Sequence, residues 1–256
     1  MKEAFTYMFK DNKFWIKALS YFSLFFTANF LLNYAQTLLP TCPRCAVSLP
    51  WQYWVLFIAG TLVNFVALGY IFSCIKTLIE QKENPLLPFV NILKDLYKGF
   101  KYAVSLILLI IPVMVIVMLL VLGIAGVTSG SIVGFILSKI LYILVFLFFG
   151  FLFIGFNWLF AGNESFFNFF KFRKVFELIW ADKKKYICHL LMILLVFTIN
   201  IFLETGFIIS SVILKLGTIG GLIFSGIFAA ITGTYMAFVI CKLTADSIMP
   251  NIQENM

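Results

Sequence analysis

Charged residues are scarce in this sequence. They form 12% of the 256 residues, against about 25% in soluble domains, while apolar residues form 62% and the mean hydropathy is +1.05. A soluble fold of this length would leave much of that apolar surface in water, so the composition excludes a soluble protein and predicts lipid as the solvent. Tracts rich in Gln, Ser or Pro are also lacking, which argues against disordered linkers and favours one integral membrane domain over residues 1–256.

Catalytic sequence patterns are lacking as well. The one histidine, His189, follows the basic run Lys183–Lys185, where it is expected to join a basic cluster and not to act as a catalyst. Motifs of serine hydrolases, zinc proteases and phosphate-binding loops are absent, as are paired carboxylates inside the apolar segments. We therefore expect no catalytic residue, no metal ion and no cofactor, and a membrane enzyme is kept only as an alternative.

Six apolar segments are long enough to cross a bilayer. A helix rises ~1.5 Å per residue, so about 20 apolar residues span the ~30 Å of hydrocarbon. Their apolar runs do not alternate with polar residues, which excludes the strands of a membrane barrel. The predicted fold class is all-α, a polytopic membrane helix bundle with six transmembrane helices arranged as three hairpins. The spans are expected at Ala18–Leu38, Trp54–Ile75, Tyr102–Leu122, Ile136–Phe160, Tyr186–Phe202 and Gly221–Leu243.

Positive residues gather at one end of these spans. Of the 19 Lys and Arg residues, all but Arg44, Lys139 and Lys215 fall on that side. Because Lys and Arg in short loops stay cytoplasmic, both termini are predicted to be cytoplasmic in a multi-pass protein of the cell membrane. The same bias explains the net charge of +8 without nucleic acid, which would require a basic soluble domain.

Three aromatic-rich amphipathic segments begin on the cytoplasmic side, near Phe5, Phe89 and Phe167. They place aromatic and aliphatic residues at helical spacing, with lysines on other faces, which is typical of helices that lie in the headgroup plane. The alternative is that they are cytoplasmic extensions of the spans.

The same segments suggest an internal repeat. The dipeptides Lys10-Asp11 and Lys94-Asp95 lie 84 residues apart, and Lys17, Lys101 and Lys185 are also spaced by 84. This spacing indicates three hairpin repeats, at about residues 1–80, 85–160 and 167–246, related by a pseudo-threefold axis along the membrane normal. The alternative is coincidence, since lysine is expected at every inner boundary.

The second inner loop carries a recognisable pattern. It consists of Leu68-Gly69-Tyr70 with Lys76, Asn84-Pro85, Leu87-Pro88-Phe89, and Leu96 with Gly99 and Lys101. About 35 residues here, together with the six-span layout, resemble a prokaryotic integral membrane family catalogued as domain of unknown function 4013. In that family acidic residues usually follow the Leu-Pro pair, whereas this chain continues with Val90-Asn91 after Phe89. The resemblance implies a fold and a membrane location, and it implies no reaction.

The first outer loop contains the motif Cys42-Pro43-Arg44-Cys45. Outside the cytoplasm the two cysteines favour a small disulfide that tightens the turn. Two alternatives stay open: a redox dithiol, since Arg44 would favour the thiolate, and half of a metal site. The redox alternative would make the protein a membrane thiol-redox enzyme.

Polar residues inside the spans form the other candidate site. Asn29, Asn33 and Gln36 lie on one stripe of the first span, Asn64 lies in the second, and Asn200 and Glu204 share one face of the fifth. Such residues could bind a polar solute or a cation in the outer half of the bundle. The alternative is that they only hydrogen-bond between helices.

The sequence favours a non-enzymatic, transport-related or accessory membrane protein that handles a small solute or a lipid. A scaffolding subunit that supports a partner is the alternative. The expected partners are the bilayer itself and anionic lipids on the cytoplasmic face, with Lys17, Lys101 and Lys185 as equivalent contacts. A membrane partner protein or a homo-oligomer is also compatible with the sequence.

Overall fold

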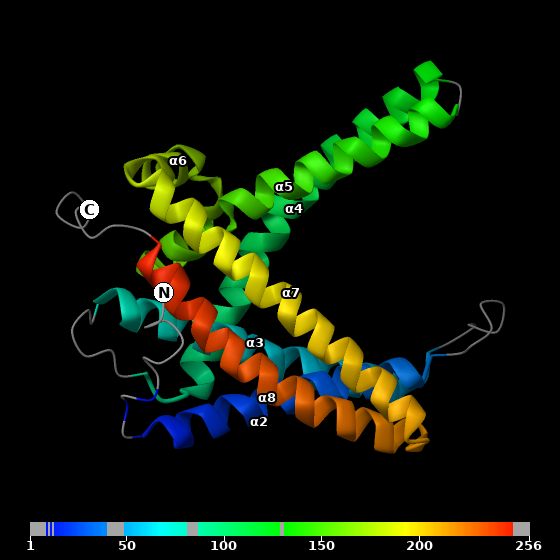
Figure 1. Ribbon diagram of the computed structural model, residues 1–256, viewed down its shortest axis with the longest axis vertical. Coiled ribbons are helices and arrows are strands. Elements are labelled where there is room, and N and C mark those ends of the chain that lie inside the picture. The colour runs from blue at the N-terminus through cyan, green and yellow to red at the C-terminus, as the bar shows by residue number, and fades with distance from the viewer. Residues whose placement is uncertain are drawn as a thin grey trace. The chain divides into compact units, whose positions relative to one another are not determined.

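The fold is described from a computed structural model of the chain, over residues 9, 11, 13–39, 49–80, 87–128 and 131–247. The chain divides into two compact units. Of the described residues, the first comprises those up to Phe100 together with Leu191–Asp246, and the second comprises those from Lys101 to Leu190 together with Ser247. Figure 1 labels the helices of both units.

Six long apolar helices confirm the predicted all-helical fold, and each is long and apolar enough to cross a membrane. Five of them extend beyond the predicted span at both ends, and α2 extends it only at its start. Lipid sets how many residues must be apolar, but a helix continues past the hydrocarbon because its hydrogen bonds stay within it. The six are α2 (Phe14–Thr37), α3 (Trp51–Glu80), α4 (Ile92–Thr128), α5 (Ile132–Asn163), α7 (Lys183–Ile213) and α8 (Gly217–Asp246).

The expected interfacial helices have two outcomes. The third segment forms the short 3-10 helix η3 (Phe166–Phe170) and a separate amphipathic helix, α6 (Phe172–Ala181). The second segment is not separate, because α4 begins at Ile92 and continues into the span. Asn91 caps this start, its side-chain oxygen accepting the Lys94 N–H at 3.1 Å. The first segment lies mostly outside the described residues.

The core of the first unit is made by α2, α3 and α8. Both α3 and α8 run antiparallel to α2. Tyr21 on α2 stacks on Tyr70 of α3 at a ring distance of 5.7 Å, and lies as close to Phe238 of α8. Gly226 and Gly233 leave space on α8 for Phe26 and Phe25 of α2, whose rings a Cβ would meet at 3.2 and 2.9 Å. Small residues thus let these two helices approach closely.

Two glycines also allow α3 and the first turns of α4 to cross with their backbones in contact. A Cβ added to Gly69 would lie 1.7 Å from the carbonyl oxygen of Asp95. A Cβ added to Gly99 would lie 1.8 Å from the carbonyl oxygen of Phe65. Both distances are far below van der Waals contact, so only glycine fits at either position.

The second unit has its own aromatic core, built from α4, α5, η3 and α6. The Tyr102 hydroxyl on α4 donates to Asn157 Oδ1 on α5 at 3.1 Å, and its ring packs edge-on against Phe160 and Phe169. The Asn168 amide of η3 donates to the carbonyl of Leu159, which fixes η3 on the end of α5. These contacts join η3 and the first turns of α4 to the end of α5.

Candidate functional site

Two features of the first unit are candidates for function: a buried ionic cluster and an apolar groove. The ionic cluster consists of Asp11, Lys17, Ser73, Asp95 and Lys98. Its charged side chains are all buried. Burying a charge is unfavourable unless the charge is paired and hydrogen-bonded, so the partners of each group matter.

The first half of the ionic cluster joins the start of α2 to the loop before α4. Asp11 Oδ2 accepts a hydrogen bond from Lys17 Nζ at 2.7 Å and from the Leu87 N–H at 3.1 Å. Asp11 Oδ1 accepts the Lys13 N–H at 2.9 Å. The Lys17 ammonium also lies 4.8 Å from the centre of the Phe89 ring, a cation–π contact. One carboxylate therefore fixes two segments that are 76 residues apart.

The second half joins α3 to α4. Asp95 Oδ1 accepts from the Ser73 hydroxyl at 2.7 Å, and Ser73 Oγ accepts from Lys98 Nζ at 3.1 Å. Asp95 Oδ2 accepts the Asn91 N–H at 2.8 Å, so this carboxylate also stabilises the start of α4. The Tyr70 hydroxyl of α3 also donates to the carbonyl of Pro88, in the loop before α4, at 3.0 Å.

The electrostatics of Asp11 favour its ionised form. Burial alone would raise the pKa of this carboxyl, but the hydrogen bond from Lys17, the two backbone N–H donors and the positive charge of Lys17 lower it further than burial raises it. The pKa of Asp11 therefore lies below its ordinary value of 3.8. The group is a charged structural element at neutral pH and is not a proton donor there.

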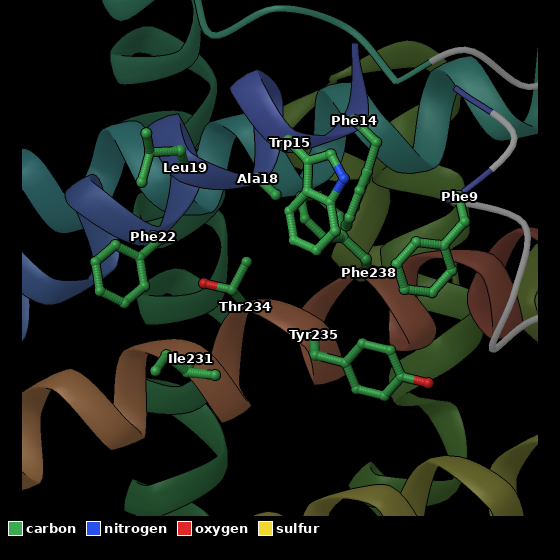
Figure 2. A pocket seen from close by; sticks show the side chains of 10 residues that line it. All are labelled: Phe9, Phe14, Trp15, Ala18, Leu19, Phe22, Ile231, Thr234, Tyr235 and Phe238. Carbon is green, nitrogen blue, oxygen red and sulfur yellow. The ribbon is translucent and has the colours of Figure 1, made fainter. Parts of the chain in front are cut away.

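The apolar groove lies between α2 and α8 (Figure 2). It has a volume of about 620 Å³, and ten residues line it. The side chains of α2 and α8 face each other across it, with the Thr234 hydroxyl as a polar group on the α8 side. The lining residues are Phe9, Phe14, Trp15, Ala18, Leu19, Phe22, Ile231, Thr234, Tyr235 and Phe238.

The predicted intramembrane polar residues are only partly brought together. Asn200 donates to Glu204 Oε1 at 2.7 Å, along one helix face as the spacing predicts. The Asn29 amide bonds the carbonyl of Phe25 in its own helix, at 2.8 Å. Asn33 lines a second pocket, of about 560 Å³, beside the turn between α7 and α8. Gln36 is exposed and Asn64 is half-buried.

Within the described ranges no hydrogen bond joins the Asn200–Glu204 pair to the asparagines of α2 or α3. A site that includes all six residues therefore stays a prediction.

The three lysines expected to contact anionic lipid lie in different surroundings. Lys17 is only 5% exposed and forms the internal ion pair with Asp11. Lys101 is half-buried and lies over the Phe166 ring at 5.3 Å. Lys185 is half-buried, and its backbone N–H donates to Asp182. Lys17 is thus set apart from the other two, and lipid binding by the three stays a prediction.

Three of the five cysteines lie within the described residues. Cys42 and Cys45 lie outside the described residues, so their disulfide stays a prediction. Cys74 and Cys241 are fully buried free thiols in the core of the first unit, and Cys188 is a half-buried free thiol. Buried thiols of this kind act as small apolar residues.

The sequence contained a signal for the ionic cluster that its interpretation did not use. Asp11 and Asp95 belong to the two Lys-Asp dipeptides that lie 84 residues apart. Both carboxylates have the same structural role, because each is buried and each accepts a backbone N–H near the start of a long helix. The three-repeat arrangement itself stays a prediction, but these two positions share their chemistry.

Comparison with known proteins places the chain in a family. Residues 53–209, which include the α3–α4 crossing, match the model of the family described as Protein of unknown function (DUF4013). No curated protein matches the chain, and no solved structure matches it either. The matched stretch covers more than half of the sequence and contains Gly69, Tyr70, Pro88 and Gly99, whose contacts position α4 against α3. This chain, a multi-pass membrane protein with six candidate transmembrane helices, therefore belongs to the DUF4013 family.

Proposed function

We propose that this protein is a non-enzymatic accessory protein of the cell membrane that binds anionic lipid on the inner leaflet, with both termini in the cytoplasm. The observation that carries the proposal is helix α6, a short helix with one apolar face packed on α5 and one basic and aromatic face left uncovered.

The apolar face of α6 is fixed by close contact. Val175, Leu178 and Ile179, at helical spacing, are buried within the second unit. Gly155 on α5 makes the contact possible, because a Cβ there would lie 2.7 Å from Val175 Cγ1. The helix is therefore held by its apolar face, and the direction of its other face is set by α5.

The uncovered face of α6 has the composition of an interfacial helix. Arg173 and Lys174 are exposed, as are the aromatic rings of Phe176 and Trp180. Aromatic rings favour the headgroup region, and cations there bind anionic lipid. The ion pair of Arg173 with Glu177 is itself exposed, so it holds the arginine only weakly.

The distribution of charge supports the inner leaflet as the location. In the sequence, α6 belongs to the connection between α5 and α7, which is on the side predicted to be cytoplasmic, where 16 of the 19 Lys and Arg residues fall. Anionic lipids are concentrated in the cytoplasmic leaflet, where each nearby Lys or Arg is worth about 1 kcal/mol. Two such charges on α6 correspond to roughly 2 kcal/mol, or about a thirtyfold preference for anionic over neutral lipid before screening.

A pair of double variants tests the proposal. Arg173→Gln with Lys174→Gln removes two charges from α6, and Lys139→Gln with Lys215→Gln removes two exposed charges from the predicted outer side. Each protein is released from nanodiscs that contain equal amounts of phosphatidylglycerol and phosphatidylcholine, and the retained lipids are weighed by native mass spectrometry.

We expect wild type and the outer variant to retain mainly phosphatidylglycerol, and the α6 variant to lose most of that preference. An equal loss in both variants would show that only net charge matters. An unchanged preference in both would show that α6 binds no lipid and would favour the scaffolding alternative.

A further inference from the structure

The groove between α2 and α8 has an apolar floor and open walls. Phe14 and Phe238 form its floor and are 6% and 0% exposed. Its walls include Trp15, Leu19 and Ile231, which are 74%, 64% and 52% exposed. Both helices are candidate membrane spans, so Leu19 and Ile231 face hydrocarbon, while Trp15 lies at the end of the groove nearest the start of α2. A hollow in this position is filled by lipid chain, because its lining atoms otherwise lose their dispersion contacts.

The size of the groove fits one chain in one leaflet. Its lining on α8 runs from Ile231 to Phe238 and on α2 from Phe14 to Phe22. At ~1.5 Å per residue these stretches are roughly 10–12 Å long, against about 15 Å for the hydrocarbon of one leaflet. The volume of about 620 Å³ lies within the range of sites that enclose small molecules.

A polar group on the groove wall lacks a partner. The Thr234 hydroxyl is buried and forms no hydrogen bond with any residue that the structure describes. Threonines in helices usually bond a carbonyl in the preceding turn, as Thr232 does with Phe228 at 3.0 Å. Thr234 instead points toward α2 (Figure 2). A ligand with a carbonyl oxygen at its head end supplies the missing acceptor.

We propose that this groove binds one acyl chain of a phospholipid, with the chain along Leu19, Phe22 and Ile231 and its ester carbonyl near Thr234. The head of the lipid then lies beside Trp15 and Tyr235, as belt aromatics do. Assignment to the inner leaflet rests on the proposed function, because it requires the start of α2 to be cytoplasmic. We propose a phospholipid and not a free fatty acid because the ester carbonyl is the acceptor assigned to Thr234. This choice is tested directly below.

Fluorescence quenching by brominated lipid tests this site, because Trp15 is part of its wall. Purified protein in detergent is titrated with phosphatidylglycerol that carries dibromostearoyl chains, and the Trp15 signal is the difference between wild type and Trp15→Phe. A matched control, Trp15→Phe with Ile16→Trp, moves the indole by one residue to a position that is also exposed, at 60% against 74%, and that does not line the groove.

We expect quenching of Trp15 to saturate near one lipid per protein, whereas the indole moved to position 16 should be quenched weakly and without saturation. Thr234→Val keeps the side-chain shape and should raise the half-saturating lipid concentration about threefold to tenfold. Equal quenching at both positions would overturn the site.

Two further outcomes would overturn parts of the proposal. If dibromostearic acid quenches Trp15 at the same concentration as the phospholipid, the occupant is a free fatty acid. If Thr234→Val binds as wild type does, the ester contact is wrong. The α6 experiment does not use Trp15, so the groove and the proposed function can fail separately.

Discussion

Replacing Gly69 with alanine should loosen the crossing of α3 and α4. The new Cβ would lie 1.7 Å from the Asp95 carbonyl oxygen, whereas ordinary contact is about 3.5 Å. The obstacle is backbone, which cannot rotate away as a side chain can, so the helices must separate by roughly 1.8 Å. Such a shift would stretch the 2.7 Å bond from Ser73 to Asp95 and the 3.0 Å bond from Tyr70 to Pro88 beyond hydrogen-bonding distance.

The expected cost follows from these losses. A hydrogen bond to a charged group contributes about 1.5–3 kcal/mol and a neutral one about 1 kcal/mol, and overpacking adds about 1–3 kcal/mol. Because the terms overlap, we expect Gly69→Ala to destabilise the protein by roughly 3–5 kcal/mol. This corresponds to a fall in melting temperature on the order of 10 °C for a chain of this length.

The assay is thermal unfolding in detergent, followed by tryptophan fluorescence and by size-exclusion chromatography. Gly99→Ala should behave like Gly69→Ala, because its Cβ would lie 1.8 Å from a carbonyl oxygen of α3. Gly206→Ala is the control, since nothing lies within 4 Å of its Cβ position. There the gain in helix propensity should leave stability unchanged or raise it by up to about 1 kcal/mol. If Gly69→Ala melts within about 2 °C of the control, the close crossing is refuted.

Three further predictions concern the ionic cluster, the second unit and the orientation. Asp11→Asn should destabilise the protein by about 3 kcal/mol at pH 7, because it leaves a buried ammonium unpaired. Folding lowers the pKa of Asp11, so the stabilisation by its carboxylate is complete above pH 3.8 and is lost as the pH falls through the lower folded-state pKa. The difference in melting temperature between wild type and variant should therefore shrink only in strong acid. Tyr102→Phe should cost about 1–3 kcal/mol in the same assay, because the buried Asn157 oxygen loses its donor, and an unchanged melting temperature would mean that this bond is not formed. In a cysteine-free background, Ser210→Cys should react with an impermeant maleimide in intact cells and Lys184→Cys only after permeabilisation, and the reverse pattern would place the termini outside.

The membrane fold could be predicted from the sequence because its cause is local. Each span needs about 20 apolar residues in succession, and backbone groups in lipid must bond within their own helix. Composition alone therefore located the six described helices. It placed the end of the fifth span too early, at Phe202, whereas α7 continues to Ile213. The amphipathic helix after Lys171 could also be predicted, because the helical spacing of apolar residues is a property of one short stretch.

The sites could not be predicted in the same way, because they depend on which helices touch. Lys17 has the sequence context of a boundary lysine, yet it is buried, because Asp11 and the loop at Leu87 fold over it. Gly69 and Gly99 belonged to a recognised pattern, but only the tertiary structure shows that each makes room for a carbonyl of the other helix.

The groove is a property of packing alone. Its lining combines residues of α2 with residues of α8 that are more than 200 positions away, so no single stretch of the sequence contains it. Apolar content determined that these helices enter the membrane. The shapes of the side chains that meet there decided where α2 and α8 pack tightly, at Gly226 and Gly233, and where they leave a hollow, because packing depends on complementary volume and not on hydrophobicity.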